Sequence, residues 1–316
     1  MRSVLRAFGA GVRAVVTAPV LLIAVTLTTM LAAVPFGVVL ESQLREALAH
    51  RQPVYLGTAE IDAEWWLEFR EHAEGMAATF TPAIIGFAAP LSNLSAILDG
   101  TSQPLVLLGP IVLAGVVWAW LWGGWIARLR AGRGLGPRAF FRAGRQHVVA
   151  FAAISLAAAA TQLVLYLTVH AVLFGPVFEW ITAMVATERA AFFWRVALYA
   201  VFGACLIAVS LAADYARISV VVERRAVTPA IATSLAFLRA HGGQAVAVYL
   251  LIGVLFVALM TLYGTAEVVG GTRLGGWRSI LIGQGFIMGR LALRLLQGAA
   301  AVSLFGQYQR PDAPVS

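Results

Sequence analysis

Long apolar runs are the feature that most constrains the fold of this chain. Each run is about as long as the 20 or so residues that an α-helix needs to cross the apolar core of a bilayer. Backbone polar groups inside a bilayer must be satisfied within the chain, which leaves α-helices for runs of this kind. The sequence therefore predicts an all-α, polytopic membrane helix bundle, with residues 1–316 as a single membrane domain. The expected transmembrane helices are residues 14–40, 104–126, 147–178, 191–222, 244–269 and 280–305.

Composition supports a membrane class. Hydrophobic residues make up 60% of the chain and charged residues 12%, whereas about a quarter of residues are charged in soluble domains. The net charge of +8 comes from 23 basic residues, all of them arginine. They cluster beside the apolar runs, where membrane orientation explains them. We therefore expect the lipid bilayer as a partner and no nucleic acid.

The arginine distribution also predicts the orientation. Six arginines and no acidic residue occur between residues 128 and 145, directly after the second expected helix. Cytoplasmic loops carry such an excess of positive charge. Residues 41–80, in contrast, are rich in glutamate. We expect both termini in the cytoplasm and the glutamate-rich segment outside.

Residues 41–103 form an expected extracytoplasmic insert between the first two helices. Apolar residues near helical spacing around Trp65 predict an amphipathic helix, and residues 79–98, broken by Pro82 and Pro90, predict a re-entrant or interfacial element. This surface could contact a protein partner. Glu68 and His72, four residues apart, could hold a divalent cation, but we favour a solvated face with no metal site and expect no cofactor.

On the cytoplasmic side, residues 228–241 predict a short interfacial helix. Thr228 can cap its start, Pro229 suits the first helical position, and Gly242 and Gly243 close it. An apolar stripe along one face favours a helix that lies at the membrane surface.

Several motifs taken together resemble a group of uncharacterised bacterial membrane proteins. The resemblance covers nearly the whole chain and implies a six-span fold in the bacterial inner membrane, with no established activity. The motifs that carry it are residues 84–89, 91–95, 98–100, 122–124, 188–189, 214–217 and 222–223.

Charged residues within the spans are the candidate site, because charges are costly in a bilayer and mark function by default. At about 1.5 Å per residue, Asp214 and Arg294 lie at similar depths, and Arg290 shares a helix face with Arg294. One alternative is a polar, cytoplasm-facing cavity that holds an anion or a lipid headgroup. We favour the other, a salt bridge between helices. The candidate ligand-binding residues are Asp214, Arg217, Gln284, Arg290 and Arg294.

No catalytic residues are assigned, because the chain lacks the motifs expected of intramembrane hydrolases, such as His-Glu-x-x-His or Gly-x-Ser-x-Gly. The first functional hypothesis is therefore a non-enzymatic structural or interaction component, which predicts a tightly packed interior. The alternative is a small-molecule or lipid permease, which predicts a cavity lined by the Asp/Arg cluster.

Overall fold

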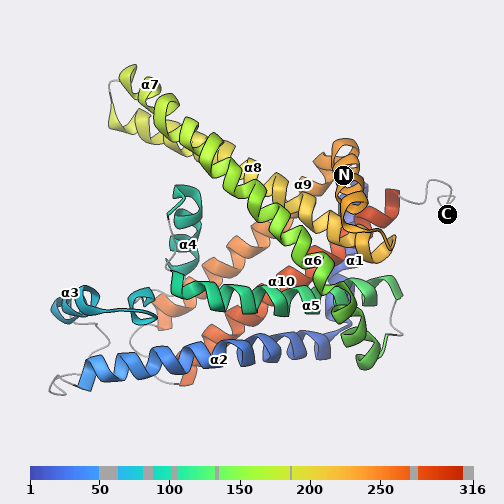
Figure 1. The fold of residues 1–316 in the computed structure, drawn as a ribbon, viewed down its shortest axis with the longest axis horizontal. Coiled ribbons are helices and arrows are strands. Elements are labelled where there is room, and N and C mark those ends of the chain that lie inside the picture. The colour runs from blue at the N-terminus through green and yellow to red at the C-terminus, as the bar shows by residue number, and fades with distance from the viewer. Residues whose placement is uncertain are drawn as a thin grey trace.

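The computed structural model describes residues 1–49, 63–80, 88–101, 105–131, 135–185, 187–270 and 277–308, and this part of the chain forms helices and no strand (Figure 1). The long helices are α1 (Arg2–Val16), α2 (Pro19–Ala49), α5 (Leu108–Ala131), α6 (Pro137–Leu165), α8 (Glu188–Val222), α9 (Val227–Gly270) and α10 (Trp277–Tyr308). The shorter elements are α3 (Ala63–His72), η1 (Ala77–Thr79), α4 (Ala88–Asp99), η2 (Leu105–Leu107), η4 (Tyr166–His170), η5 (Leu173–Val177) and α7 (Phe178–Ala183).

Six of the helical segments are long and apolar enough to cross a membrane. They carry many large apolar side chains on their outer surfaces, for example Val112 on α5, Leu156 on α6 and Val254 on α9. Contiguous exposed apolar surface of this extent suits lipid rather than water. The all-α, polytopic fold predicted from the sequence is confirmed, and the chain is a multi-pass membrane protein.

Several helix boundaries differ from those expected. The first run is divided, because α1 ends at Val16 and Pro19 begins α2. The third span starts at Pro137 and continues through η4, η5 and α7 to Ala183. Residues 228–241 are helical and continue directly into the fifth span as α9, but His241, with φ and ψ of −132° and 19°, is not helical, so two helical segments meet at a kink where the expected interfacial helix ends.

The insert after α2 contains α3, η1 and α4, in agreement with helical elements at this place in the chain. On α3, Trp66 stacks on Phe69, and both rings meet Phe80. Of the expected re-entrant segment, residues 81–87 lie outside the described residues, whereas residues 88–99 form α4.

The buried core is concentrated at one end of the molecule, which we call the basic end because the ends of α5 and α6 there carry Arg128, Arg130, Arg138, Arg142 and Arg145. Here Trp125, Tyr215 and Phe305 are almost fully buried. The amphipathic α1 packs on α10, where a Cβ added at Gly11 would lie 2.8 Å from the Leu296 side chain. The six spans are therefore held together mainly at this end.

Away from the basic end the helices diverge. Helices α2, α5 and α10 lie side by side, while α6 and α8 form a diagonal arm with α7 at its tip (Figure 1). Gly123 of α5 and Gly144 of α6 mark the crossing, because a Cβ at Gly123 would lie 3.2 Å from the Gly144 Cα. Beyond this contact the two helices separate, which creates space between them.

Candidate functional site

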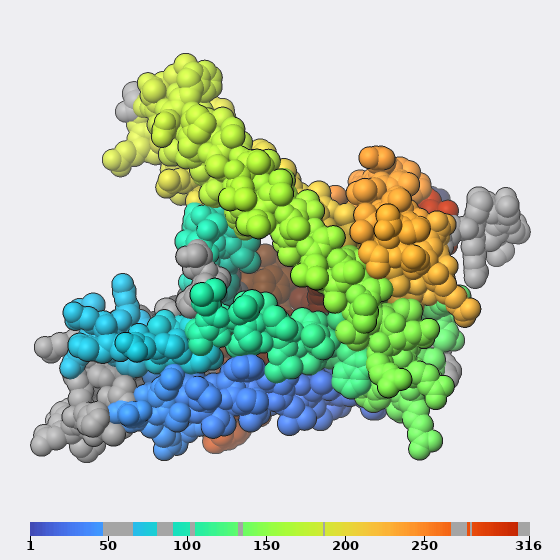
Figure 2. All heavy atoms as spheres, viewed as in Figure 1, coloured from blue at the N-terminus to red at the C-terminus, as the bar shows by residue number. Residues whose placement is uncertain are grey.

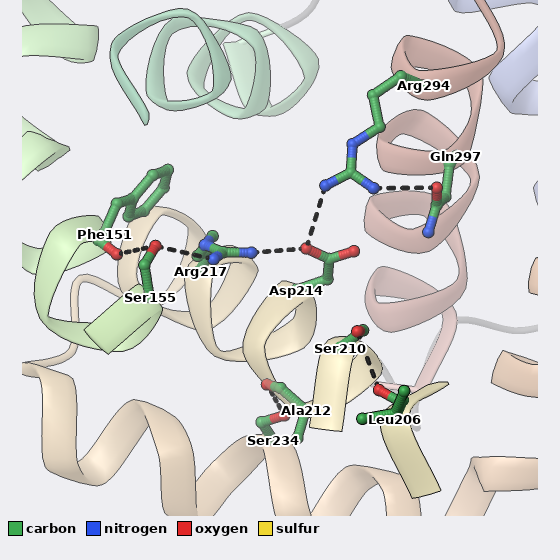
Figure 3. A network of polar contacts seen from close by, with 10 residues as sticks. All are labelled: Phe151, Ser155, Leu206, Ser210, Ala212, Asp214, Arg217, Ser234, Arg294 and Gln297. Atoms are coloured by element: carbon green, nitrogen blue, oxygen red, sulfur yellow. Dashed lines mark hydrogen bonds and ion pairs between the residues drawn. The ribbon is translucent and has the colours of Figure 1, made fainter. Parts of the chain in front are cut away.

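Asp214 of α8 lies at the centre of a polar network (Figure 3). Its carboxylate lies 2.7 Å from Arg217 Nη1, one turn further along the same helix, and 3.9 Å from Arg294 Nη2 of α10. The Asp214 side chain is 11% exposed and that of Arg217 is 17% exposed. A carboxylate buried to this extent is costly without cationic partners, and these two arginines supply them.

Arg217 extends the network to a third helix. Its Nη2 donates a hydrogen bond of 3.0 Å to Ser155 Oγ on α6, and Ser155 in turn donates to the Phe151 carbonyl oxygen (Figure 3). Arg294 donates a long hydrogen bond of 3.4 Å to Gln297 Oε1. The polar contacts thus connect α6, α8 and α10 where the helices begin to separate.

A cavity of about 760 Å³ lies beside this network. This volume falls within the range of about 300 to 1,000 Å³ typical of small-molecule sites. Figure 2 shows the hollow from the side on which α5 and the α6–α8 arm diverge. Six helices contribute to its lining, and the polar side chains among these residues are Thr29, Trp118, Trp122, Ser155, Arg217, Tyr249, Arg290, Arg294 and Gln297.

The charge of the lining is positive. Arg217, Arg290 and Arg294 all line the cavity. Among the described residues, the ion pairs of Arg217 and Arg294 share a single carboxylate, that of Asp214. Arg290 has neither an ion pair nor a hydrogen bond in this part of the chain, and its guanidinium lies 6.0 Å from the Phe286 ring centre. The site therefore has cationic capacity beyond what Asp214 neutralises.

Trp122 adds a hydrogen-bond donor without a partner. The residue is 6% exposed, lines the cavity, and its Nε1 has no hydrogen-bond partner among the described residues. The Arg294 guanidinium lies 5.2 Å from its ring centre, a cation–π contact. A Cβ at Gly298 would lie 2.5 Å from the six-membered part of the indole, so Gly298 leaves room for this ring.

The structure brings most of the sequence-predicted site residues together. Asp214, Arg217 and Arg294 form the ion-paired cluster, and Arg290 lines the cavity without joining the pairs. Gln284 does not belong to the lining; its Oε1 is buried and lacks a partner among the described residues.

Sequence reasoning missed Ser155, Trp122 and Gln297. Gln297 could have been identified, because it follows Arg294 by three residues and so shares its helix face. Ser155 and Trp122 carried no comparable signal. A serine in an apolar helix is common, and tryptophans at the end of a span are expected of any membrane protein.

A second polar cluster contacts the C-terminal end of α4. Tyr166 donates a hydrogen bond to the Ile97 carbonyl, Tyr199 donates to the Asp99 carboxylate, and His170 Nε2 lies 3.0 Å from the Leu98 carbonyl oxygen. His170 therefore contacts the C-terminal end of α4.

Neither a search for metal-binding groups nor a comparison with known proteins assigns a function to this site. The described residues contain no group of three or more His, Cys, Asp or Glu side chains placed to hold a metal ion. His72 Nδ1 lies 2.9 Å from the Glu68 carbonyl oxygen of its own helix. Comparisons with protein-family models, with curated proteins and with solved structures found no match.

Proposed function

We propose that this protein is a permease-type membrane protein that binds an anionic ligand in its central cavity and moves it between membrane compartments. The observation that carries the proposal is the cavity itself, lined by three arginines of which two share one carboxylate. Guanidinium groups bind phosphates and carboxylates through paired hydrogen bonds. The site therefore suits an anion.

The position of Arg290 strengthens this argument. It lies near the middle of α10, and among the described residues it has neither a carboxylate nor a hydrogen-bond partner. A charged group at this depth is costly unless it is paired or hydrated. A bound anion would supply the missing partner, and the open cavity gives it room.

The cavity also favours this function over a structural or interaction role. A purely structural component was expected to have a tightly packed interior, and the packing here is confined mainly to the basic end. The α3–α4 region remains a candidate surface for an extracytoplasmic protein partner. The contacts of this region with the rest of the chain do not by themselves indicate that such a partner binds there.

The proposal includes an orientation and a location. We place the basic end in the cytoplasm, with both termini, because positively charged loops are retained there. The resemblance of the sequence motifs to bacterial proteins suggests the inner membrane. In this orientation the Asp214 cluster lies towards the cytoplasmic side of the cavity.

Transport by the purified full-length protein in phosphatidylcholine vesicles tests this function. The probes are radiolabelled phosphate, radiolabelled acetate and a fluorescent phosphatidylglycerol whose exposure is read with dithionite. We expect at least one anionic probe to cross faster than in protein-free vesicles. Loss of the Arg290 charge in Arg290→Gln removes an interaction with a charged group, so transport falls about tenfold or more.

Arg278→Gln is the matched control. It makes the same change on the same helix, outside the cavity lining, and should transport at the wild-type rate. If all three probes cross at the protein-free rate, or if both variants lose transport equally, the proposed function is wrong.

A further inference from the structure

The cavity is polar at one end and apolar at the other. Along α10 its lining begins with Ile287, passes Arg290 and Arg294, and ends at Gln297 towards the basic end. The ten residue steps from Ile287 to Gln297 correspond to about 15 Å of helix. On the antiparallel α9 the order matches, with Tyr249 towards the basic end and Phe256 away from it. The lining therefore suits a molecule with one charged end and one apolar end.

The open side of the cavity borders surface that faces lipid. Beyond the contact between Gly123 and Gly144, α5 and α6 diverge, and Figure 2 shows the hollow between them. The flanking surfaces carry exposed apolar side chains, among them Val116 on α5 and Leu156 and Leu163 on α6. A lipid could enter sideways here without its chains leaving the apolar phase.

One cavity-lining cation lacks a partner among the described residues, because the Arg290 guanidinium forms neither an ion pair nor a hydrogen bond there. Arg294, one turn further along α10, lines the same cavity, and its contacts with Asp214 and Gln297 are long. Two guanidinium groups with this spare bonding capacity match an acceptor with several oxygens, such as a phosphate.

We infer that the ligand is an anionic phospholipid. Arg290 and Arg294 bind its phosphate, and its acyl chains occupy the apolar end of the cavity and the opening between α5 and α6. This inference rests on the proposed function and names the ligand class of that site. The headgroup points towards the basic end, which is the orientation of a lipid in the leaflet on that side.

Binding to the full-length protein in an uncharged detergent tests the ligand class. Native mass spectrometry measures the affinities for phosphatidylglycerol and for phosphatidylcholine with the same acyl chains. The shift in unfolding temperature measures binding of inorganic phosphate. We expect phosphatidylglycerol to bind about tenfold more tightly than phosphatidylcholine, since its net negative charge is not cancelled by a choline group and can pair with the unneutralised arginines.

Three variants locate the site. Arg290→Gln should lower the affinity for phosphatidylglycerol about tenfold or more, and Arg294→Gln, which removes a guanidinium that Asp214 partly neutralises, by a smaller factor of about threefold. Arg278→Gln should leave it unchanged. If Arg290→Gln does not yield folded protein, Arg294→Gln decides the question.

The outcomes separate the two proposals. Equal affinities for the two lipids, or an equal loss in Arg290→Gln and Arg278→Gln, overturn the lipid inference. Inorganic phosphate that binds as tightly as the lipid and depends on Arg290 overturns it as well, while the proposed function stands. If neither phosphate nor phosphatidylglycerol binds at this site, both proposals fail.

Discussion

At the scale of single residues, glycines determine how closely the helices approach one another. A Cβ at Gly144 would lie 2.4 Å from the backbone oxygen of Trp120, and one at Gly124 would lie 2.8 Å from the Phe140 ring. The motif of residues 122–124 therefore has a packing role at the contact between α5 and α6. Gly285, in contrast, has no heavy atom within 4 Å of its added Cβ.

Replacing Gly144 should destabilise the protein. In Gly144→Ala the methyl group meets backbone, which cannot rotate away, so α5 and α6 must separate; overpacking of this kind costs about 1 to 3 kcal/mol. Gly285→Ala on α10 is the control and should be neutral or slightly stabilising, because alanine favours a helix more than glycine does. Thermal unfolding in detergent measures both. Equal stability of the two variants would show that the close contact is not required.

Residue-level prediction from the sequence succeeded where helix geometry alone determines position. The shared depth of Asp214 and Arg294 predicted their proximity, and their closest atoms lie 3.9 Å apart. Gln284 was also predicted from its depth but does not line the cavity. Depth along a helix does not show which way a side chain faces. The hydrogen bond between Arg217 and Ser155 depends on how α6 crosses α8. No local sequence pattern specifies that crossing, so this contact could not be predicted.

At the scale of secondary structure elements, α4 is held by its C-terminal end. Gly100 follows the helix with a φ of 66°, which favours glycine, and the Thr101 amide donates to the Ala96 carbonyl, as in many helix ends. A Cβ at Gly100 would lie 3.2 Å from the Tyr166 ring. The closed helix end thus fits against η4, and Tyr199 of α8 bonds to Asp99 beside it.

Docking of α4 should depend on pH. The pKa of Asp99 lies below its ordinary value of 3.8, chiefly because the Tyr199 hydroxyl donates to the carboxylate, then because Ser95 does, with Arg195 and His170 adding positive charge nearby. A lowered pKa means that this contact stabilises docking above the ordinary pKa and is lost as the pH falls through the lowered value. We therefore expect α4 to be docked near pH 6 and released well below pH 3.8.

The mobility of a spin label at Leu94→Cys, in a background with Cys205→Ser, measures this release. Asp99→Asn should give a mobile label already at pH 6, which separates the effect of Asp99 from that of other carboxylates. Tyr199→Phe should act in the same direction. A label that is equally immobile in all variants and at both pH values would contradict the prediction.

The element boundaries show which features the sequence could locate. The six spans were recognisable from their apolar length, and Gly242 and Gly243 marked the place where His241 leaves helical geometry. The interruption is a kink and not a loop, since α9 is helical on both sides of His241. The glycines alone do not distinguish these outcomes, because glycine tolerates a helix interior at modest cost. Before the kink, Phe237 packs against Tyr215 and Phe305.

At the scale of the whole molecule, the divergence of the helices away from the basic end follows from unequal packing. Tight contacts occur where α1, α5, α8, α9 and α10 meet at the basic end, and the exposed apolar surfaces dominate elsewhere. Hydropathy predicts that helices cross a membrane but does not predict their angles. The cavity could therefore be proposed from the charges, whereas its position between diverging helices could not.

The orientation of the whole molecule can be checked with reporter fusions. We expect green fluorescent protein to fluoresce when fused after Leu135 or after Arg225, because both positions follow arginine-bearing ends that should remain in the cytoplasm. Alkaline phosphatase should be active when fused after His72. Active phosphatase after Leu135 would reverse the orientation and the leaflet assigned to the ligand.

The contact between α1 and α10 has a consequence for biosynthesis. Helix α1 is translated before the other described helices, yet the surface that packs against Gly11, around Leu296 and Ala300, belongs to α10, which is translated after them. Until α10 is made, the buried face of α1, which includes Val4 and Ala7, lacks this helix as a packing partner. The membrane surface can shelter this amphipathic face in the meantime. Helix α10, which is made after the other described helices, thus completes the docking of α1.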